Sequence, residues 1–382
     1  MRSPTRSPIV HKMHYQHASV RIFHLGFTRT AITFAYFKNL LSVYKRVRLL
    51  IFINRMFRMN RFGLLLISFS VLLGANAFAD STMDEPQNCF RGPFESYEKW
   101  ETVMNKKKPG FDIEAFHRAF PAEKFNQRKA ELDCTDFTYQ SDQFNVEGFY
   151  LAPKSPEKQL PVVIFNRGGN AGFGYIVFGT KMDLPAELAS EGDIVLGSQY
   201  RGASRHLSNN GNDEFGGADV NDVLALIDIA KTLPQADTSR IALVGWSRGV
   251  MQSYLSAKQL PKLKAIVSIA GNADLTQAVV WRPAMEKVYA ARIPDYATQK
   301  HQRLAERSVI NWLDKLPPAP ILMLHGTADE RVSAEQSVLL AKALNGAGHK
   351  NKLILYDGDN HSLSNNRIQA FTEIKTWLNQ YL

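Results

Sequence analysis

The sequence predicts an α/β fold, with a mostly parallel sheet and helices on both of its faces. From residue 136 onward, short apolar runs rich in Val, Ile and Leu alternate with longer amphipathic stretches, as strands alternate with helices in such a sheet. The hydrophobic content of 45% across 382 residues is sufficient to fill a large core. Residues 80–132 contain helix-like stretches and no strand-like run, so we expect 80–135 to form a short helical N-terminal extension ahead of the sheet.

Eight strands are expected within the domain 136–382, and a polar turn joins the first two. They span 137–139, 146–151, 162–165, 194–197, 241–244, 265–269, 321–324 and 353–356. Helices are expected at 248–258, 334–344 and 368–378. Ser333 and Gln336 have the spacing of a capping box at the start of the second of these helices.

The longest stretch between expected strands, 273–316, has two interpretations. It either roofs a functional site as an inserted lid that selects ligands, or it covers the sheet with ordinary helices. Trp281, Tyr289 and Tyr296 are its candidate pocket residues. Whether the stretch moves is left open by the sequence.

Basic residues are concentrated at the N-terminus. Residues 1–79 hold 12 Lys or Arg and no Asp or Glu, so the rest of the chain carries 34 basic and 36 acidic residues. The formal charge of +10 therefore does not indicate a basic groove, and no nucleic-acid partner is expected.

A secretory signal peptide is expected at 59–79. Arg58 and Arg61 precede the apolar run 62–73, and Ala77-Phe78-Ala79 forms a small-residue cleavage site. A membrane anchor is the alternative, because 62–79 is uncharged, but cleavage would leave no stable anchor. We expect a periplasmic or secreted protein, and we interpret residues 1–58 as an over-extended translation start.

Cys89 and Cys134 are the only cysteines. An even pair in an exported chain is a disulfide candidate, which would tie the extension 80–135 to the domain that follows. The alternative is two buried free thiols.

Ser247 is the candidate nucleophile. It lies in Gly245-Trp246-Ser247-Arg248-Gly249, a G-x-S-x-G pattern between the apolar run 241–244 and an expected helix. The glycines permit a sharp turn that exposes the Ser oxygen, as in the α/β-hydrolase fold. A plain turn serine is the alternative, since the pattern by itself is common.

Asp329 and His361 follow the next expected strands in the order Ser, Asp, His that this fold uses. His361 would accept the Ser247 proton, and Asp329 would orient the imidazole. The alternatives are a capping Asp and a surface His. Asp357 and Asp359 are nearer to His361 in sequence, but residues of the same loop cannot easily reach its far nitrogen.

An acyl-transfer site also needs donors for the oxyanion. One candidate is the backbone N–H of Arg248. The second is the N–H of Arg167 or Gly168, in the loop Asn166-Arg167-Gly168-Gly169 after an expected strand. The glycine pair could instead form a tight turn alone.

The domain resembles the catalytic domain of the prolyl oligopeptidase family of serine peptidases. The segments that carry the resemblance surround the Gly245–Gly249 pentapeptide: Tyr200-Arg201-Gly202, FGGADVND at 215–222, DTSR at 237–240, RSVINW at 307–312 and HGTADERV at 325–332. The resemblance implies a triad of Ser247, Asp329 and His361, no metal or organic cofactor, and a structural role for Asp222.

The chain departs from this family in three respects. Residues 80–135 are too few to form the family's β-propeller. The loop 166–169 has no Tyr of the kind that often supplies an oxyanion donor, and Val250 replaces a second Gly after the nucleophile turn.

A serine hydrolase that cleaves small peptide or ester substrates is therefore expected, with a prolyl oligopeptidase-like peptidase as the leading interpretation. A carboxylesterase or deacylase is the alternative, because the same triad serves both reactions. A non-catalytic binding protein is a third interpretation, against which the complete triad argues. No H-E-x-x-H or clustered His and Cys spacing indicates a metal site. The oligomeric state is left open.

Overall fold

The computed structural model describes residues 82–382. The expectations for 1–58 and for a signal peptide at 59–79 lie outside the described residues. In the part of the chain that is described, no helix is both long and apolar enough to cross a bilayer.

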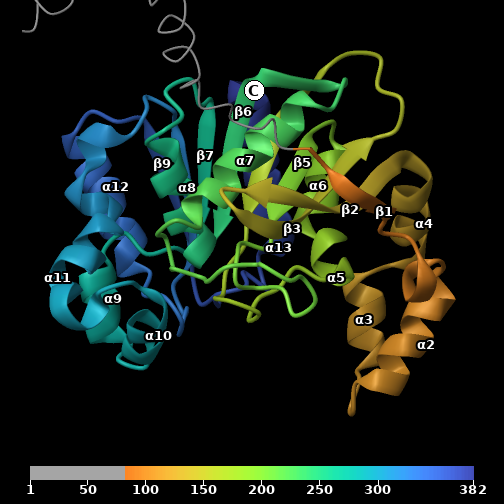
Figure 1. The fold of residues 1–382 in the computed structure, drawn as a ribbon, viewed down its shortest axis with the longest axis horizontal. Helices are drawn as coiled ribbons and strands as arrows, with labels where there is room; N and C mark the ends of the chain where they lie inside the picture. Colours follow the sequence, from red (N-terminus) through yellow and green to blue (C-terminus); the bar gives the residue numbers. More distant parts are fainter. Residues whose placement is uncertain (1–81) are drawn as a thin grey trace, which may run out of the picture. The chain divides into compact units, whose positions relative to one another are not determined.

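A mostly parallel sheet lies at the centre of the fold (Figure 1), which confirms the predicted fold class. Its strand order is β1-β2-β3-β5-β4-β6-β7-β8-β9. The pairs β1–β2, β2–β3 and β3–β5 are antiparallel, and the remaining pairs are parallel. The strands are β1 Asp84–Asn88, β2 Leu132–Ser141, β3 Phe144–Pro153, β4 Leu160–Asn166, β5 Ile194–Ser198, β6 Ala236–Trp246, β7 Ala265–Ile269, β8 Ile321–Gly326 and β9 Asn351–Tyr356.

All eight expected strands are present, but the described sheet has nine. The ninth, β1, corrects the expectation that 80–132 contains no strand. Its sequence, Asp-Glu-Pro-Gln-Asn, is polar and exposed throughout, and it pairs with β2 from Asp84↔Thr138 to Asn88↔Thr135. An edge strand of this kind depends on backbone pairing and buries no side chain, so it leaves no apolar alternation in the sequence.

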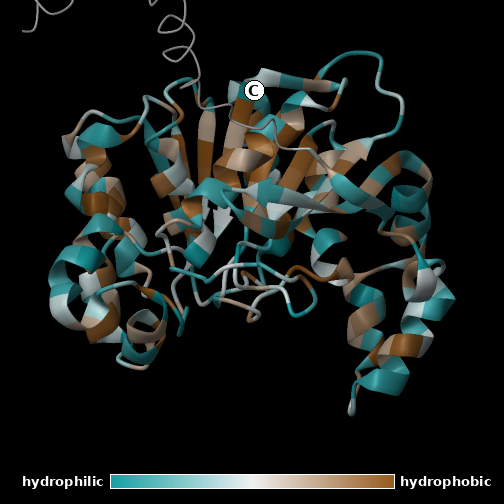
Figure 2. Cartoon of the chain, in the orientation of Figure 1, coloured by the Kyte–Doolittle hydropathy of each residue, from teal (hydrophilic) through white to brown (hydrophobic). Residues whose placement is uncertain are grey.

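Helices cover both faces of the sheet. One face carries α7 Val220–Lys231, α8 Arg248–Ala257 and α12 Glu335–Gly346, and the other carries α6 Leu184–Ser190 and α13 Arg367–Tyr381. Alternate residues of β4 divide between the two cores: Val162 and Ile164 join the first, and Val163 and Phe165 join the second. Figure 2 shows the central strands as the most hydrophobic part of the chain.

The capping box expected at α12 does not form. Gln336 instead accepts hydrogen bonds through Oε1 from the backbone N–H groups of Ala273 (2.9 Å) and Asp274 (2.8 Å). Its side chain is therefore used to hold the start of the 273–316 segment, which a local spacing rule cannot anticipate.

The N-terminal extension contains η1 Gly92–Phe94, α2 Tyr97–Lys107, α3 Ile113–Ala119 and α4 Ala122–Glu131. Cys89, just after β1, and Cys134, on β2, are joined in a disulfide with Cα atoms 5.3 Å apart. Trp100 on α2 packs edge-on against Phe178, with ring centroids 4.9 Å apart, at the start of α5 Phe178–Lys181. The extension is thereby fixed to a segment that reaches the functional site.

The segment 273–316 lies between β7 and β8. It forms α9 Leu275–Trp281, α10 Met285–Arg292, α11 Tyr296–Glu306, η2 Val309–Asn311 and η3 Leu313–Lys315, and the three α-helices group together in Figure 1.

Candidate active site

Ser247 lies on a strained turn between β6 and α8. Its φ of 58° and ψ of −120° are unfavourable for a residue with a side chain. The turn also needs the flanking glycines, because a Cβ at Gly249 would lie 1.9 Å from the Asn166 carbonyl oxygen and one at Gly245 would lie 2.4 Å from the Gly249 oxygen. The sequence thus holds a serine at the carboxyl end of the sheet in a conformation typical of an exposed nucleophile.

Asp329 and His361 meet across two loops, after β8 and β9. Nδ1 of His361 lies 2.7 Å from Oδ2 of Asp329, and the carboxylate can only accept, so the imidazole donates. Oδ1 of Asp329 accepts from the backbone N–H groups of Arg331 (2.7 Å) and Val332 (3.0 Å). With a further contact from His325, four polar contacts fix this buried carboxylate.

The two acids nearer to His361 in sequence have other partners. Asp359 accepts from the backbone N–H groups of Asn360 (2.8 Å) and Asn366 (2.9 Å), and Asp357 accepts from the Thr327 hydroxyl (3.1 Å). Asp329 is accordingly the acid that the fold brings to His361.

A second histidine, His325, also contacts Asp329, although the sequence motifs indicated no role for it. His325 Nε2 lies 3.1 Å from Oδ2 of Asp329, while its Nδ1 lies 2.7 Å from the Ser337 hydroxyl. Burial raises the pKa of Asp329, but the hydrogen bonds from His325 and His361 outweigh this effect and hold the pKa well below its usual value. The sequence signal for His325 is its position at the start of the 325–332 segment, four residues before Asp329.

Ser247 and His361 line one cavity of about 740 Å³, within the range of ligand pockets. Among the described residues, no hydrogen bond joins the Ser247 hydroxyl to His361. The neighbouring Trp246 donates from Nε1 to the His361 carbonyl oxygen at 3.2 Å, which links the two loops directly.

Gly168 lies against the nucleophile turn. A Cβ built on it would be 3.1 Å from Cβ of Ser247 and 3.2 Å from the Trp246 oxygen. The side chain of Arg167 points elsewhere, since it is buried and donates to the carbonyl oxygens of its own loop and of Gln199. Arg167 therefore braces the loop, and Gly168 is the residue of this loop shown to abut Ser247.

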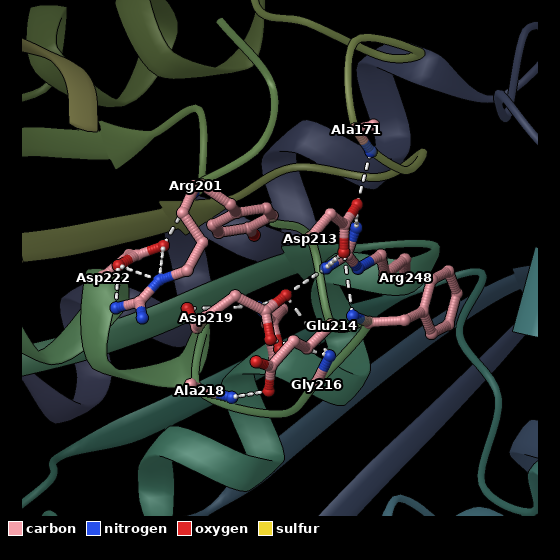
Figure 3. A network of polar contacts seen from close by, with 12 residues as sticks. Ala171, Arg201, Asp213, Glu214, Gly216, Ala218, Asp219, Asp222 and Arg248 are labelled. Atoms are coloured by element: carbon pink, nitrogen blue, oxygen red, sulfur yellow. Dashed lines mark hydrogen bonds and ion pairs between the residues drawn. The ribbon is translucent and has the colours of Figure 1, made fainter. Parts of the chain in front are cut away.

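Arg248, the residue after Ser247, turns its side chain into a buried charge network (Figure 3). Nη1 and Nη2 each lie 2.7 Å from a carboxylate oxygen of Asp213, and Nη2 also contacts Asp219. Two carboxylates thus face one guanidinium in a water-excluded site. The sequence motifs indicated no role for either acid, because both lie about thirty residues before Arg248, in a long loop.

The two carboxylates are held differently. Burial raises the pKa of Asp213, but Arg248 and the N–H groups of Ala171 and Phe215 reverse this and leave the pKa lowered. Burial raises the pKa of Asp219 to about 6, because the opposing effect of Arg248 is offset by the nearby charges of Asp213 and Asp222. Asp213 is therefore the carboxylate of the two that ionises at the lower pH.

Arg201 and Asp222 form a second buried pair beside this network (Figure 3). Arg201 donates from Nε (3.0 Å) and Nη2 (2.7 Å) to Oδ1 of Asp222, and its backbone N–H donates to Oδ2 at 2.7 Å. Asp222 thus connects α7 to the loop after β5, away from the cavity-lining residues, as the family resemblance implied.

The 273–316 segment contributes to the cavity, but not through all the expected residues. Trp281 and Tyr289 line it, together with Leu275, Ala278, Arg282, Met285 and Val288. Tyr296 does not, and its ring instead packs behind Tyr289 at a centroid distance of 6.4 Å. The expectation for Tyr296 is therefore wrong, because this side chain is buried beside Tyr289 and does not reach the cavity.

The fold and this site define a serine hydrolase of the α/β-hydrolase class. Residues 182–382 match the model of the prolyl oligopeptidase family, and the chain belongs to that family.

Curated relatives match parts of the chain at low identity. The uncharacterized peptidase YtmA of Bacillus subtilis is 26% identical over 207 residues, which cover 54% of this chain and 77% of YtmA. Dipeptidyl-peptidase 5 of Porphyromonas gingivalis is 27% identical over 222 residues, covering 53% and 31% of the two chains. The rat acylamino-acid-releasing enzyme is 25% identical over 281 residues, covering 69% and 36%. The chain thus spans about a third of the length of the two larger relatives.

Solved structures agree on the fold. The acylaminoacyl peptidase of Pyrococcus horikoshii superposes with a TM-score of 0.58 at 20% identity, over 66% of this chain and 42% of that one. A puromycin-hydrolyzing peptidase of Mycobacterium tuberculosis superposes with a TM-score of 0.57 at 22% identity, over 65% and 39%.

Proposed function

We propose that the protein is a serine peptidase that cleaves short peptides through an acyl-enzyme, with Ser247 as nucleophile, His361 as general base and Asp329 as its orienting acid. The observation that carries this proposal is the 2.7 Å contact between His361 and Asp329 in the cavity that also exposes Ser247. Family membership and the peptidase names of the relatives support the choice of a peptide substrate.

In the first step the Ser247 hydroxyl oxygen attacks the scissile carbonyl carbon while His361 accepts the hydroxyl proton. The tetrahedral intermediate then expels the amine, which takes that proton from His361. His361 then takes a proton from a water molecule, which attacks the acyl-enzyme. As this second tetrahedral intermediate releases the acid, the Ser247 oxygen takes that proton back from His361. Asp329, whose pKa is held low, stays ionised and stabilises the imidazolium.

The oxyanion formed in both steps needs two donors. We assign them to the backbone N–H groups of Arg248 and Gly168. Arg248 follows the nucleophile directly, and Gly168 abuts Ser247 without a side chain that would fill the space. Of the two backbone donors expected in this loop, those of Arg167 and Gly168, we choose the N–H of Gly168 because Gly168 is the residue that abuts Ser247.

The test is labelling with a fluorophosphonate probe together with turnover of aminoacyl and peptidyl p-nitroanilides. Ser247→Ala should abolish both. Ser362→Ala is the matched control, because Ser362 is an exposed serine lining the same cavity, and it should retain labelling. Labelling of the Ser247→Ala protein at the wild-type level would refute the assignment of the nucleophile.

A parallel panel of p-nitrophenyl esters distinguishes the peptidase from a carboxylesterase. Rapid ester turnover without cleavage of any amide would favour the esterase, which uses the same three residues. We retain the carboxylesterase as a second candidate because the oxyanion loop reads Asn-Arg-Gly-Gly and lacks the Tyr that peptidases of the family often carry there.

We also propose that the protein is periplasmic or secreted. The Cys89–Cys134 disulfide supports export, since structural disulfides persist in oxidising compartments. Fractionation of the natural host, with alkylation of free thiols before lysis, tests this: cytoplasmic protein with two reactive thiols would overturn it.

A further inference from the structure

The cavity that holds Ser247 is positively charged, although the chain beyond residue 79 carries slightly more acid than base. Apart from His361, its charged lining residues are five arginines and one acid: Arg167, Arg248, Arg282, Arg331, Arg367 and Asp183. The excess of basic groups is therefore a local property of this site.

Three of the arginines have structural partners. Arg248 is paired with Asp213 and contacts Asp219. Arg367 is paired with Asp183. Arg167 is buried and donates to backbone carbonyl oxygens. Burial and the nearby charge of Arg248 lower the pKa of Arg167 to about 10, and the carboxylates of Asp213 and Asp219 partly oppose this shift. These three arginines are thus matched by three nearby carboxylates, and their contacts brace the cavity wall. The carboxylates are Asp183, Asp213 and Asp219.

Arg282 and Arg331 are different. Within residues 82–382, neither guanidinium takes part in a hydrogen bond or an ion pair. Their backbones are nevertheless fixed: Arg331 N–H donates to Oδ1 of Asp329 at 2.7 Å, and Arg282 N–H donates to the Ala278 oxygen at 2.9 Å. Two cationic side chains are thus anchored at the cavity with their donor groups unused.

Apolar groups lie beside these two cations. Trp281 precedes Arg282 and is 47% exposed, and Phe173 on the opposite loop is 67% exposed. Large apolar side chains that line a cavity and stay exposed are commonly covered by ligand. The cavity therefore offers an apolar surface together with an uncompensated positive charge.

We propose that Arg282 and Arg331 bind a carboxylate of the substrate, so that the enzyme prefers acidic substrates with an apolar portion. The inference rests on the hydrolase function proposed above and names its substrate class. A guanidinium forms paired, charge-assisted hydrogen bonds with a carboxylate, and a concave site of one sign concentrates ligands of the opposite sign. The carboxylate lies either on the acyl portion or on the leaving group.

Two matched substrate pairs test the proposal and separate these two positions. In the first pair, the same dipeptide p-nitroanilide carries an N-terminal succinyl group or its neutral succinamyl counterpart. In the second pair, an acetylated tripeptide ends in a free carboxylate or in its amide. The readout is the ratio of kcat/KM for the anionic member to that for the neutral member, at low and high salt.

We expect a ratio of about 10 or more in at least one pair, the effect of one charge-assisted hydrogen bond, and a fall of this ratio with salt. Arg282→Gln and Arg331→Gln should each lower the ratio, and the double variant should bring it near 1. Arg292→Gln is the matched control, because Arg292 belongs to α10 of the same segment but does not line the cavity, and it should keep the wild-type ratio.

Ratios near 1 in both pairs for the wild-type protein, or a high ratio that survives in the double variant, would overturn the proposal. The proposed hydrolase function fails separately, when neither member of any pair is cleaved and the fluorophosphonate does not label Ser247.

Discussion

The guanidinium of Arg248 pairs with the carboxylate of Asp213 through two hydrogen bonds, with Nη1 2.7 Å from Oδ2 and Nη2 2.7 Å from Oδ1. Oδ2 of Asp213 also accepts from the backbone N–H of Ala171, and Nη1 of Arg248 lies 3.2 Å from the Gly169 oxygen. Because Arg248 follows Ser247, this pair joins the nucleophile turn to the loop that carries Gly168.

Replacing Asp213 should therefore impair catalysis as well as stability. In Asp213→Asn the guanidinium loses one of its two carboxylate partners in a buried site and keeps Asp219, so we expect a loss of folding free energy near the lower end of the about 3–5 kcal/mol that removing a buried partner costs in comparable cases. We expect kcat to fall about tenfold or more while KM changes little, because the oxyanion loop loses its anchor. Asp228→Asn, which removes an exposed acid of α7, should leave kcat and the melting temperature near wild type. A variant of Asp213 with unchanged kcat would contradict the positioning role.

Gly168→Ala should slow the reaction without unfolding the protein. The new methyl group would lie 3.1 Å from Cβ of Ser247 and 3.2 Å from the Trp246 oxygen, so the loop must move away from the nucleophile by a few tenths of an ångström. We expect a loss of about 10–100-fold in kcat, which is smaller than the roughly 100–1,000-fold loss on removing an oxyanion donor, because the donor is displaced and not removed. Gly346→Ala has open space around its new methyl group and should keep wild-type kinetics.

Asp329→Asn should lower kcat by about three to four orders of magnitude, since the amide cannot stabilise the imidazolium and favours the wrong tautomer of His361. Asp359→Asn removes an acid that is two residues from His361 but bonds only to backbone and Asn366 groups. Its effect should appear as a lower melting temperature, with a much smaller change in kcat. Equal losses of kcat in the two variants would contradict the assignment of Asp329.

Reduction of the Cys89–Cys134 disulfide should destabilise the protein. The bond closes a loop across a sequence separation of 45 residues, for which the chain-entropy argument gives about 4 kcal/mol. We expect a melting temperature several degrees lower in dithiothreitol. The Cys89→Ser, Cys134→Ser double variant should melt at the reduced temperature and show no response to the reductant.

Asp193 should make the protein less stable as the pH rises from about 4 to 7. Burial, with a smaller contribution from Glu191, raises the pKa of Asp193 to about 7. Between its ordinary value of 3.8 and 7, the unfolded chain has lost this proton while the folded chain retains it, so unfolding becomes easier as the pH rises and the effect levels off above 7.

Asp193→Asn removes this titration. At pH 8 the variant should be more stable than wild type by more than about 1 kcal/mol, since each unit of raised pKa corresponds to about 1.4 kcal/mol. The difference should shrink toward pH 4. Urea unfolding at several pH values measures it, and Asp314→Asn, an exposed acid, should show no such pH trend. A constant difference from pH 4 to 8 would contradict the prediction.

Sequence patterns were sufficient for features that follow from local or topological rules. Apolar runs placed eight strands, because burial on both faces of a parallel sheet demands them. The glycines around Ser247 predicted a turn that only small residues permit, and the chain order placed Asp329 and His361 after successive strands. The two cysteines could only be named as a disulfide candidate, since a count of two fits free thiols as well.

The tertiary structure decided what depends on contacts between distant residues. Arg248 pairs with Asp213, which lies 35 positions earlier in the chain. Gln336 binds the 273–274 backbone and does not cap its own helix. Tyr296 packs beside Tyr289 and not into the cavity. No local pattern encodes these partners, because each is selected by the packing of whole elements. The sequence by itself predicted a serine hydrolase and proposed Ser247, Asp329 and His361 as its central residues, because a local motif and the order of the strands are enough for that. Only the three-dimensional packing decided how the site is braced and which of its arginines have no partner among residues 82–382, because those contacts join distant parts of the chain.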